Sequence, residues 1–199
     1  TVSCIGGIVP ANSVQAASLK IRYSGKTRYY KGKQLHVSYA NKNLSSKYVG
    51  IQINKVNMIP YYDYLVKQGP KVKRTYSKSS GKLILKNGDD TLTAYVGKRT
   101  YYLNGVKKTF SVAPTKVKYY KTKKTIILIP ANAIVKGLGL NYKYSSSSKR
   151  IYITQPVIPS DSTTQLQTQP SGSVQYTNYN KSLSAYVTAE KKQHPTYGG

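Results

Sequence analysis

The chain has few of the residues that enzymes and metal proteins depend on. Its 199 residues include one cysteine, two histidines, five acidic residues, one phenylalanine and no tryptophan. A single cysteine excludes an internal disulfide and a site built from several thiolates. General acid–base catalysis needs positioned carboxylates or imidazoles, and residues 17–150 offer three Asp, no Glu and one His. The composition therefore argues against an enzyme in this stretch.

The individual residues that could do chemistry have simpler interpretations. His36 lies in the alternating run 34–39, which is typical of a strand. Asp89 and Asp90 follow Asn87-Gly88, a tight-turn signal, so they are interpreted as turn residues rather than a metal pair. Nucleophile elbows, phosphate-binding glycine loops and metal-ligand spacings do not occur. We predict no catalytic residue, no cofactor and no metal.

Positive charge dominates the composition. The chain has 32 Lys and Arg against five acidic residues, a net charge of +27. Residues 17–150 hold 29 of the basic residues and three of the acidic ones, an excess of 26 positive charges. Such a surface attracts polyanions, and the candidates are nucleic acid, anionic lipid and teichoic acid. The alternative is a solvated outer face without a dedicated ligand.

A predicted strand, short helix and hairpin occupy residues 123–153. The apolar run 126–129 is typical of a strand, and the Pro130 that follows suits the first position of a helix. One apolar helix face is predicted from residues at i, i+3, i+4 and i+7: Ala131, Ile134, Val135 and Leu138. Gly139 is placed to end this helix in a left-handed conformation. Residues 141–144 and 150–153 then form two short strands joined by a serine-rich loop.

The same plan occurs earlier in the chain, which indicates a duplication. At an offset of 70 residues, Ile59-Pro60 aligns with Ile129-Pro130 and Gly69 with Gly139. The copies span about 19–87 and 92–155, and helices are expected at 60–68 and 130–138. We predict an α+β fold of two similar units, each a small antiparallel sheet packed on one short helix. The two units should pack as one body, because about 70 residues barely support a core.

These motifs resemble the stalk-type domain named after the N-terminal domain of copper amine oxidases, a module of secreted Gram-positive bacterial proteins. The matching residues are Leu103-Asn104-Gly105, Ile129-Pro130, Leu138-Gly139 and Ile151 to Ile153. The sequence departs from the family pattern at Asn132, where Arg is common, at Lys136, where Glu is common, and at Tyr144, where Trp is common. The resemblance implies a small antiparallel sheet wrapped on a helix, and no copper site.

Both ends of the chain differ from its middle. Residues 1–16 carry no charge and end in Val14-Gln15-Ala16, which is typical of the end of a secretory signal peptide. The alternatives are a buried first strand and a lipoprotein signal at Cys4. Residues 156–182 are rich in Ser, Thr, Gln and Pro and are predicted to be a disordered linker. Residues 183–199 are interpreted as the start of a further domain, similar to the lead-in to the hydrolase domain of cell-wall enzymes.

One segment combines basic and aromatic residues in a way that suits polyanion binding. The candidate residues are Lys116, Lys118, Tyr119, Tyr120, Lys121, Lys123 and Lys124. The alternative is a solvated loop. Secretion makes teichoic acid or peptidoglycan the expected partner, rather than intracellular nucleic acid, and no transmembrane segment is expected in the mature chain.

Three functions remain open at this point. The first is a non-catalytic stalk of the 17–155 domain that spaces, and retains at an anionic cell wall, a domain attached to it. The second is a self-standing extracellular polyanion-binding module or adhesin. The third is the N-terminal part of a peptidoglycan hydrolase whose catalytic domain lies beyond residue 199.

Overall fold

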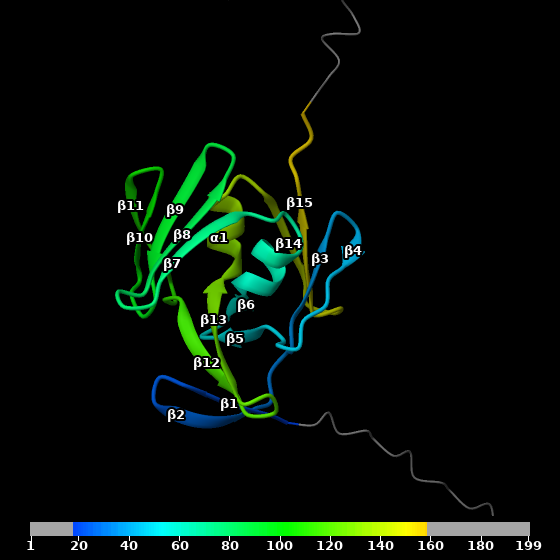
Figure 1. Ribbon diagram of the computed structural model, residues 1–199. Helices are drawn as coiled ribbons and strands as arrows, with labels where there is room; N and C mark the ends of the chain where they lie inside the picture. The colour runs from blue at the N-terminus through cyan, green and yellow to red at the C-terminus, as the bar shows by residue number, and fades with distance from the viewer. Residues whose placement is uncertain (1–17, 159–199) are drawn as a thin grey trace, which may run out of the picture. The chain divides into compact units, whose positions relative to one another are not determined.

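The predicted order of strand, short helix and hairpin occurs twice in the structure, a computed structural model that describes residues 18–158 (Figure 1). The first occurrence consists of β6 (Val56–Pro60), the π-type helix η1 (Tyr62–Lys67), β7 (Lys73–Ser77) and β8 (Lys82–Asn87). The second consists of β13 (Lys124–Pro130), α1 (Ala131–Gly137), β14 (Asn141–Ser145) and β15 (Arg150–Thr154). Both predicted helices are confirmed.

The two prolines end strands rather than begin helices. Pro60 pairs with Leu128 and Pro130 with Met58, where β6 and β13 run side by side. Pro130 has φ −64° and ψ 110°, so it is the extended residue directly before α1. Its fixed φ suits both the strand end and the cap position. Helix α1 therefore starts at Ala131, one residue later than the sequence predicts.

Gly69 and Gly139 occupy equivalent positions after the two helices. Their φ angles are +61° and +77°, in the left-handed region that favours glycine. The amide of Gly139 donates to the carbonyl of Lys136 at 3.0 Å, so this glycine closes α1 as predicted. A Cβ at Gly69 would collide with the carbonyl oxygen of Tyr64. The backbone itself requires glycine there.

Replacing Gly69 with alanine is expected to lower the free energy of unfolding by about 2–3 kcal/mol, since left-handed strain and a backbone collision add. Gly88→Ala is the matched control: its φ is +59°, but no atom lies within 4 Å of the added Cβ. We expect a loss of about 1 kcal/mol for this control. Urea unfolding of both variants measures the difference. Equal losses would show that the collision at Tyr64 relaxes without cost.

Fifteen strands within residues 18–158 form three sheets. The six-stranded sheet has the order β2 (Lys26–Tyr30), β1 (Leu19–Tyr23), β12 (Thr115–Tyr119), β13, β6 and β5 (Ile51–Ile53). The five-stranded sheet has the order β11 (Val106–Thr109), β10 (Thr100–Leu103), β9 (Asp90–Tyr95), β8 and β7. The four-stranded sheet has the order β14, β15, β3 (His36–Tyr39) and β4 (Lys42–Asn43).

The prediction of two units with one sheet each is wrong, because every sheet combines strands of both copies. The hairpin β14–β15 of the second copy joins β3 of the first, with Ile151 opposite Val37 in a parallel pair. The hairpin β7–β8 of the first copy continues into β9 of the second. The fold is mostly β, with two short helices. A copy alone could not cover its helix on all sides, and the exchange of hairpins supplies the missing apolar surface.

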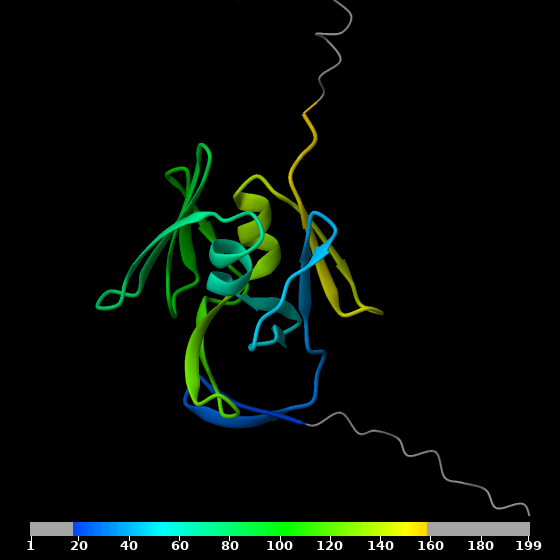
Figure 2. The same cartoon turned by 45° about the vertical axis from the view of Figure 1, so that its right-hand side comes forward.

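Both helices lie between the five-stranded and the four-stranded sheet (Figures 1 and 2). The main core forms around them and includes Leu65 of η1, Ile134 of α1, Leu85 of β8 and Ile151 of β15, all fully buried. A second core lies against the six-stranded sheet. It consists of Ile21, Ile51, Ile53, Met58, Val112, Val117, Tyr119 and Leu128. The second core fixes which side chains of β1 and β12 point inward and which point to solvent.

Several predictions fall outside the described residues. They are the signal remnant at 1–16, the linker from residue 159 onward and the further domain at 183–199. Residues 156–158 are described, are exposed and form no helix or strand. Within residues 18–158, no helix is both long and apolar enough to cross a membrane.

Candidate polyanion-binding surface

The predicted binding segment forms strand β12, the turn after it and the first residue of β13. Lys116 and Lys118 lie on the side of β12 that faces away from the second core, and Tyr120 follows them on that side. Lys121, Lys123 and Lys124 are exposed where the chain turns from β12 to β13. Six of the seven predicted residues are therefore accessible to a ligand.

Tyr119 is the exception, and its prediction as a binding residue is wrong. Only 2% of its surface is exposed. Its hydroxyl donates to the carbonyl of Val49 at 2.6 Å, and its ring meets that of Tyr48 edge-on at 5.2 Å between centroids. Burial raises the pKa of this phenol. Since neighbouring residues of a strand point to opposite sides, Tyr119 and Tyr120 cannot both face the ligand.

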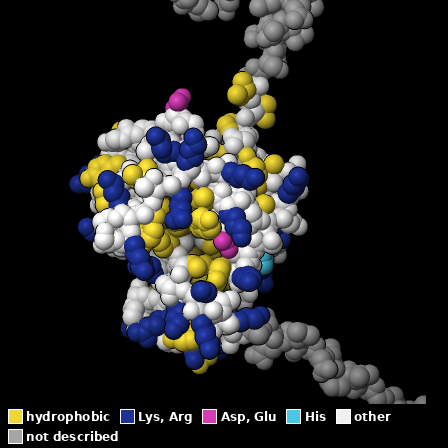
Figure 3. Space-filling model, in the orientation of Figure 1, with side chains coloured by type: hydrophobic (Ala, Val, Ile, Leu, Met, Phe, Trp, Pro, Cys, Tyr) yellow, Lys and Arg dark blue, Asp and Glu magenta, His cyan; other side chains and the backbone are white. Residues whose placement is uncertain are grey.

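The structure places basic and aromatic residues of β1 and β2 beside those of β12. In the sheet, Arg22 of β1 lies directly opposite Lys118, and Lys20 lies opposite Tyr29 of β2. The amide of Tyr120 donates to the carbonyl of Lys20 at 3.1 Å. We name this surface the basic–aromatic face and define it as Lys20, Arg22, Tyr29, Lys116, Lys118 and Tyr120. Figure 3 shows basic side chains around hydrophobic surface at this end of the domain, over β1 and β2.

Tyr120 is at the centre of the basic–aromatic face. The ammonium nitrogens of Lys20 and Lys118 lie 4.7 Å and 5.0 Å from its ring centroid. At these distances, cation–π attraction holds the two lysines over the ring, and their ammonium groups stay accessible. The pKa of Tyr120 is lowered, first by a hydrogen bond between its hydroxyl and Thr27 and then by the charges of Lys118, Arg22 and Lys20. The local potential therefore favours negative charge.

Two cations, Arg22 of β1 and Lys118 of β12, occupy opposite positions in this part of the sheet. Like charges directly opposite in a sheet destabilise it, and Arg22 and Lys118 are such a pair. The acidic side chains Asp63 and Asp90 are engaged elsewhere, where they accept hydrogen bonds from Ser46 and Asn104. A polyanion laid across β1 and β12 would relieve this repulsion.

Lys20, Arg22 and Tyr29 lie outside the binding segment predicted from the sequence. A local signal for the first two exists in the alternation Leu19-Lys20-Ile21-Arg22-Tyr23, which predicts cations on one side of a strand. The sequence contains no signal that β1 pairs with β12, which is nearly a hundred residues away. The binding surface could therefore be found only in part from the segment 115–124.

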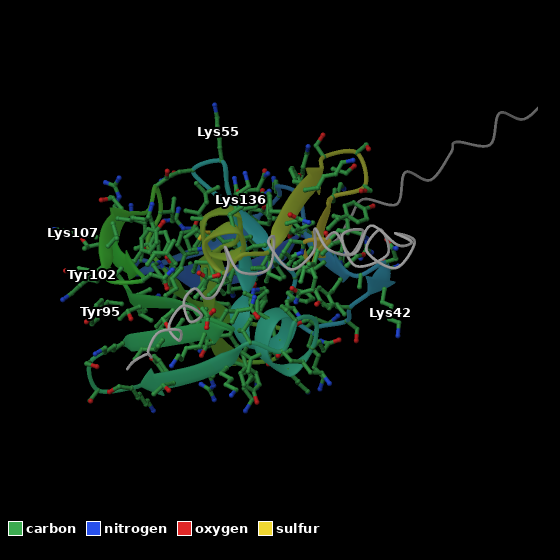
Figure 4. All side chains as sticks on the ribbon, turned by 90° about the horizontal axis from the view of Figure 1, so that it is seen from above. Lys42, Lys55, Tyr95, Tyr102, Lys107 and Lys136 are labelled. Carbon is green, nitrogen blue, oxygen red and sulfur yellow. The ribbon has the colours of Figure 1, made fainter. Side chains whose placement is uncertain are left out.

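Basic residues also occur away from the basic–aromatic face. Figure 4 shows Lys42, Lys55 and Lys107 directed outward on different sides of the domain. A second basic cluster surrounds a pocket of about 370 Å³ and consists of Lys71, Lys73 and Lys86. Lys73 and Lys86 are also opposite each other, in β7 and β8. This cluster has three cations and no tyrosine in the lining of its pocket, so it serves as a control for the basic–aromatic face.

The described residues do not assemble a reaction centre. His36 is exposed at the start of β3, and its pKa is lowered first by partial burial and then by Arg150 and Lys149. Asp90 pairs with Asn87 at the end of β8–β9, which confirms the turn interpretation. Among residues 18–158, no three His, Cys, Asp or Glu residues come together as a metal site.

The three sheets and two short helices define a mostly β domain. The model of the copper amine oxidase N-terminal domain family matches residues 39–153, which is more than half of the chain. The chain belongs to this family, and the domain family is not itself catalytic. Neither the comparison with curated proteins nor that with solved structures gives a match.

Proposed function

We propose that the domain is a non-catalytic spacer that holds the secreted protein containing it at an anionic cell-wall polymer. The observation that carries this proposal is the basic–aromatic face, where Lys20 and Lys118 form cation–π contacts with Tyr120 and Arg22 lies opposite Lys118 in the sheet. Phosphate groups of a wall teichoic acid suit the cations, and the tyrosine rings supply apolar contact area. The polymer of a Gram-positive wall is the partner that we propose.

Binding of this kind must weaken with salt. Exposed charges are screened within about 8 Å at physiological ionic strength. Cations that neutralise phosphates of a single-chain polymer release counterions, so the logarithm of affinity falls linearly with the logarithm of salt concentration. We expect the protein to adsorb to purified Gram-positive walls at low salt, to desorb as salt is raised, and to adsorb less to walls stripped of teichoic acid.

Changing Lys20, Arg22 and Lys118 together to glutamine tests the site. We expect weaker adsorption and a salt slope smaller by about 2, because about 0.7 is lost for each phosphate contact. Lys71, Lys73 and Lys86 changed to glutamine form the control, with the same change in net charge. Adsorption measured over a salt series should be weakened less by the control. Equal loss in both variants would mean that the charge acts as a whole, without a dedicated face.

Adsorption that ignores both salt and teichoic acid would contradict the proposal and point to an uncharged glycan or a protein receptor. No adsorption at any salt concentration would leave a spacer whose charge serves solubility.

A further inference from the structure

A pocket of about 520 Å³ opens next to the basic–aromatic face. Four stretches of chain line this open pocket: Ser24 after β1, Asn54 between β5 and β6, Val96-Gly97 after β9, and Ser111 to Pro114 before β12. Its volume is within the range of small-molecule sites, about 300–1,000 Å³. The proposed function does not use this pocket, because the basic–aromatic face lies on the sheet beside it.

Backbone contacts fix the shape of the pocket. The amide of Gly97 donates to the carbonyl of Pro114 at 2.7 Å, which ties the turn after β9 to the segment before β12. Arg99 donates through Nε to the carbonyl of Phe110 at 2.7 Å, and the amide of Phe110 donates back to Arg99 at 2.8 Å. The site is therefore formed without a ligand, which reduces the ordering cost of binding.

The lining combines three kinds of groups. Ile53 and Val112, each 8% exposed, and the ring of Tyr23 supply apolar surface. Ser24, Asn54 and Ser111 supply hydroxyl and amide groups. Arg99 and Lys116 supply positive charge, and no acidic residue lines the pocket. A sugar ring has matching features, since its C–H face packs on apolar and aromatic surface while its hydroxyls form hydrogen bonds. The two cations additionally favour a negative group attached to that ring.

Lys116 belongs to both the pocket and the basic–aromatic face. Lys118 and Tyr120 follow it at alternate positions on the same side of the chain, and Arg22 lies opposite Lys118. Alternate side chains of a strand are about 6.6–6.8 Å apart along the sheet. A single polymer can therefore place one unit in the pocket and successive negative groups on the cations that lead away from it.

We propose that this pocket binds a sugar unit of a phosphate-bearing glycan whose phosphates lie along Lys116, Lys118 and Arg22. The inference rests on the proposed function and adds selectivity to it. The cations provide attraction to any polyanion, whereas the pocket distinguishes polymers that carry sugar from those that do not.

Two polymers of equal length test this selectivity with the full 199-residue chain. One is poly(glycerol phosphate), and the other is the same polymer substituted with N-acetylglucosamine. We expect the substituted polymer to bind about tenfold more tightly, which corresponds to about 1.4 kcal/mol. Ser111→Trp, which fills the pocket, should abolish the preference. Ser146→Trp, in the exposed turn between β14 and β15, is the control and should keep it.

The outcomes separate the two proposals. Binding of both polymers with equal affinity by the unchanged protein overturns the sugar site and leaves the proposed function intact. A preference that persists in Ser111→Trp also overturns the sugar site, because the sugar must then bind elsewhere. If neither polymer binds, the proposed function fails, and N-acetylglucosamine 1-phosphate added to the labelled protein decides the pocket by NMR. Shifts of the Ser111, Val112 and Ala113 amides would support the site, and their absence would overturn it.

Discussion

Replacing Tyr119 with alanine is expected to lower the free energy of unfolding by about 3–5 kcal/mol, the usual cost of removing a buried aromatic ring. The side chain fills the second core and its hydroxyl holds the carbonyl of Val49. Tyr120→Ala should cost less than about 1 kcal/mol in stability, because its ring lies on the solvent side of the sheet. The same change should weaken polyanion binding, since Lys20 and Lys118 lose the ring that positions them.

Chemical denaturation and polymer binding, measured on both variants, separate the two roles. Tyr119→Phe is the conservative control: it keeps the ring and leaves the Val49 carbonyl without its donor, at an expected cost of about 1–3 kcal/mol. This control should bind polymer as the unchanged protein does. Reduced binding by folded Tyr119→Phe would show that the buried tyrosine acts at the surface after all.

Alkaline pH is expected to destabilise the domain steeply between pH 10 and pH 12. Burial, with a smaller effect of the nearby Asp63 charge, raises the pKa of Tyr64 from 10.0 to about 12. In the unfolded chain this phenol loses its proton near pH 10, whereas in the fold it keeps the proton to higher pH. The unfolded state then binds fewer protons, so stability falls as pH rises. Tyr64 alone accounts for about 2.3 kcal/mol of the loss by pH 12, where the folded phenol is half ionised, and for about 2.7 kcal/mol at higher pH.

Other buried phenols act in the same direction. Burial also raises the pKa values of Tyr61, Tyr119 and Tyr142. Lysines lose their charge over the same range, which relieves repulsion and opposes the effect. Tyr64→Phe isolates one phenol, and we expect its stability to fall less steeply, by up to about 1.4 kcal/mol per pH unit. Denaturant unfolding at several pH values, with phenolate absorbance recorded, provides the measurement. An unchanged pH dependence in Tyr64→Phe would assign the loss to other groups.

Local sequence patterns predicted the helices and strands better than they predicted which strands pair with each other. The i, i+3, i+4 spacing around Ile134 and the positive φ at Gly139 follow from short-range rules, and both are present. Residues 51–60 form the hairpin β5–β6, because Asn54 and Lys55 take left-handed φ angles of 48° and 66°. A turn without glycine gives little warning in the sequence. The exchange of hairpins between the copies depends on which apolar faces remain uncovered, and no local pattern contains that information.

The candidate surface was predictable to the extent that it lies within one strand. Lys116, Lys118 and Tyr120 alternate with the inward Val117 and Tyr119, so stricter use of the two-residue period would have excluded Tyr119. The contribution of β1 required knowledge of a long-range strand pair. The pocket next to it requires four separate turns to meet, which only the folded chain shows.

The pairing of β3 with β15 also sets an order for folding during synthesis. β3 ends at Tyr39, and its parallel partner ends at Thr154. A ribosome or a translocation channel releases β3 long before β15. The backbone N–H and C=O groups along one edge of β3 therefore lack their hydrogen-bond partners while most of the domain is made. Exposed strand edges of this kind promote aggregation. A protein with this topology therefore gains from delivery as a complete chain, or from a chaperone that shields the early segment until residue 154 has emerged.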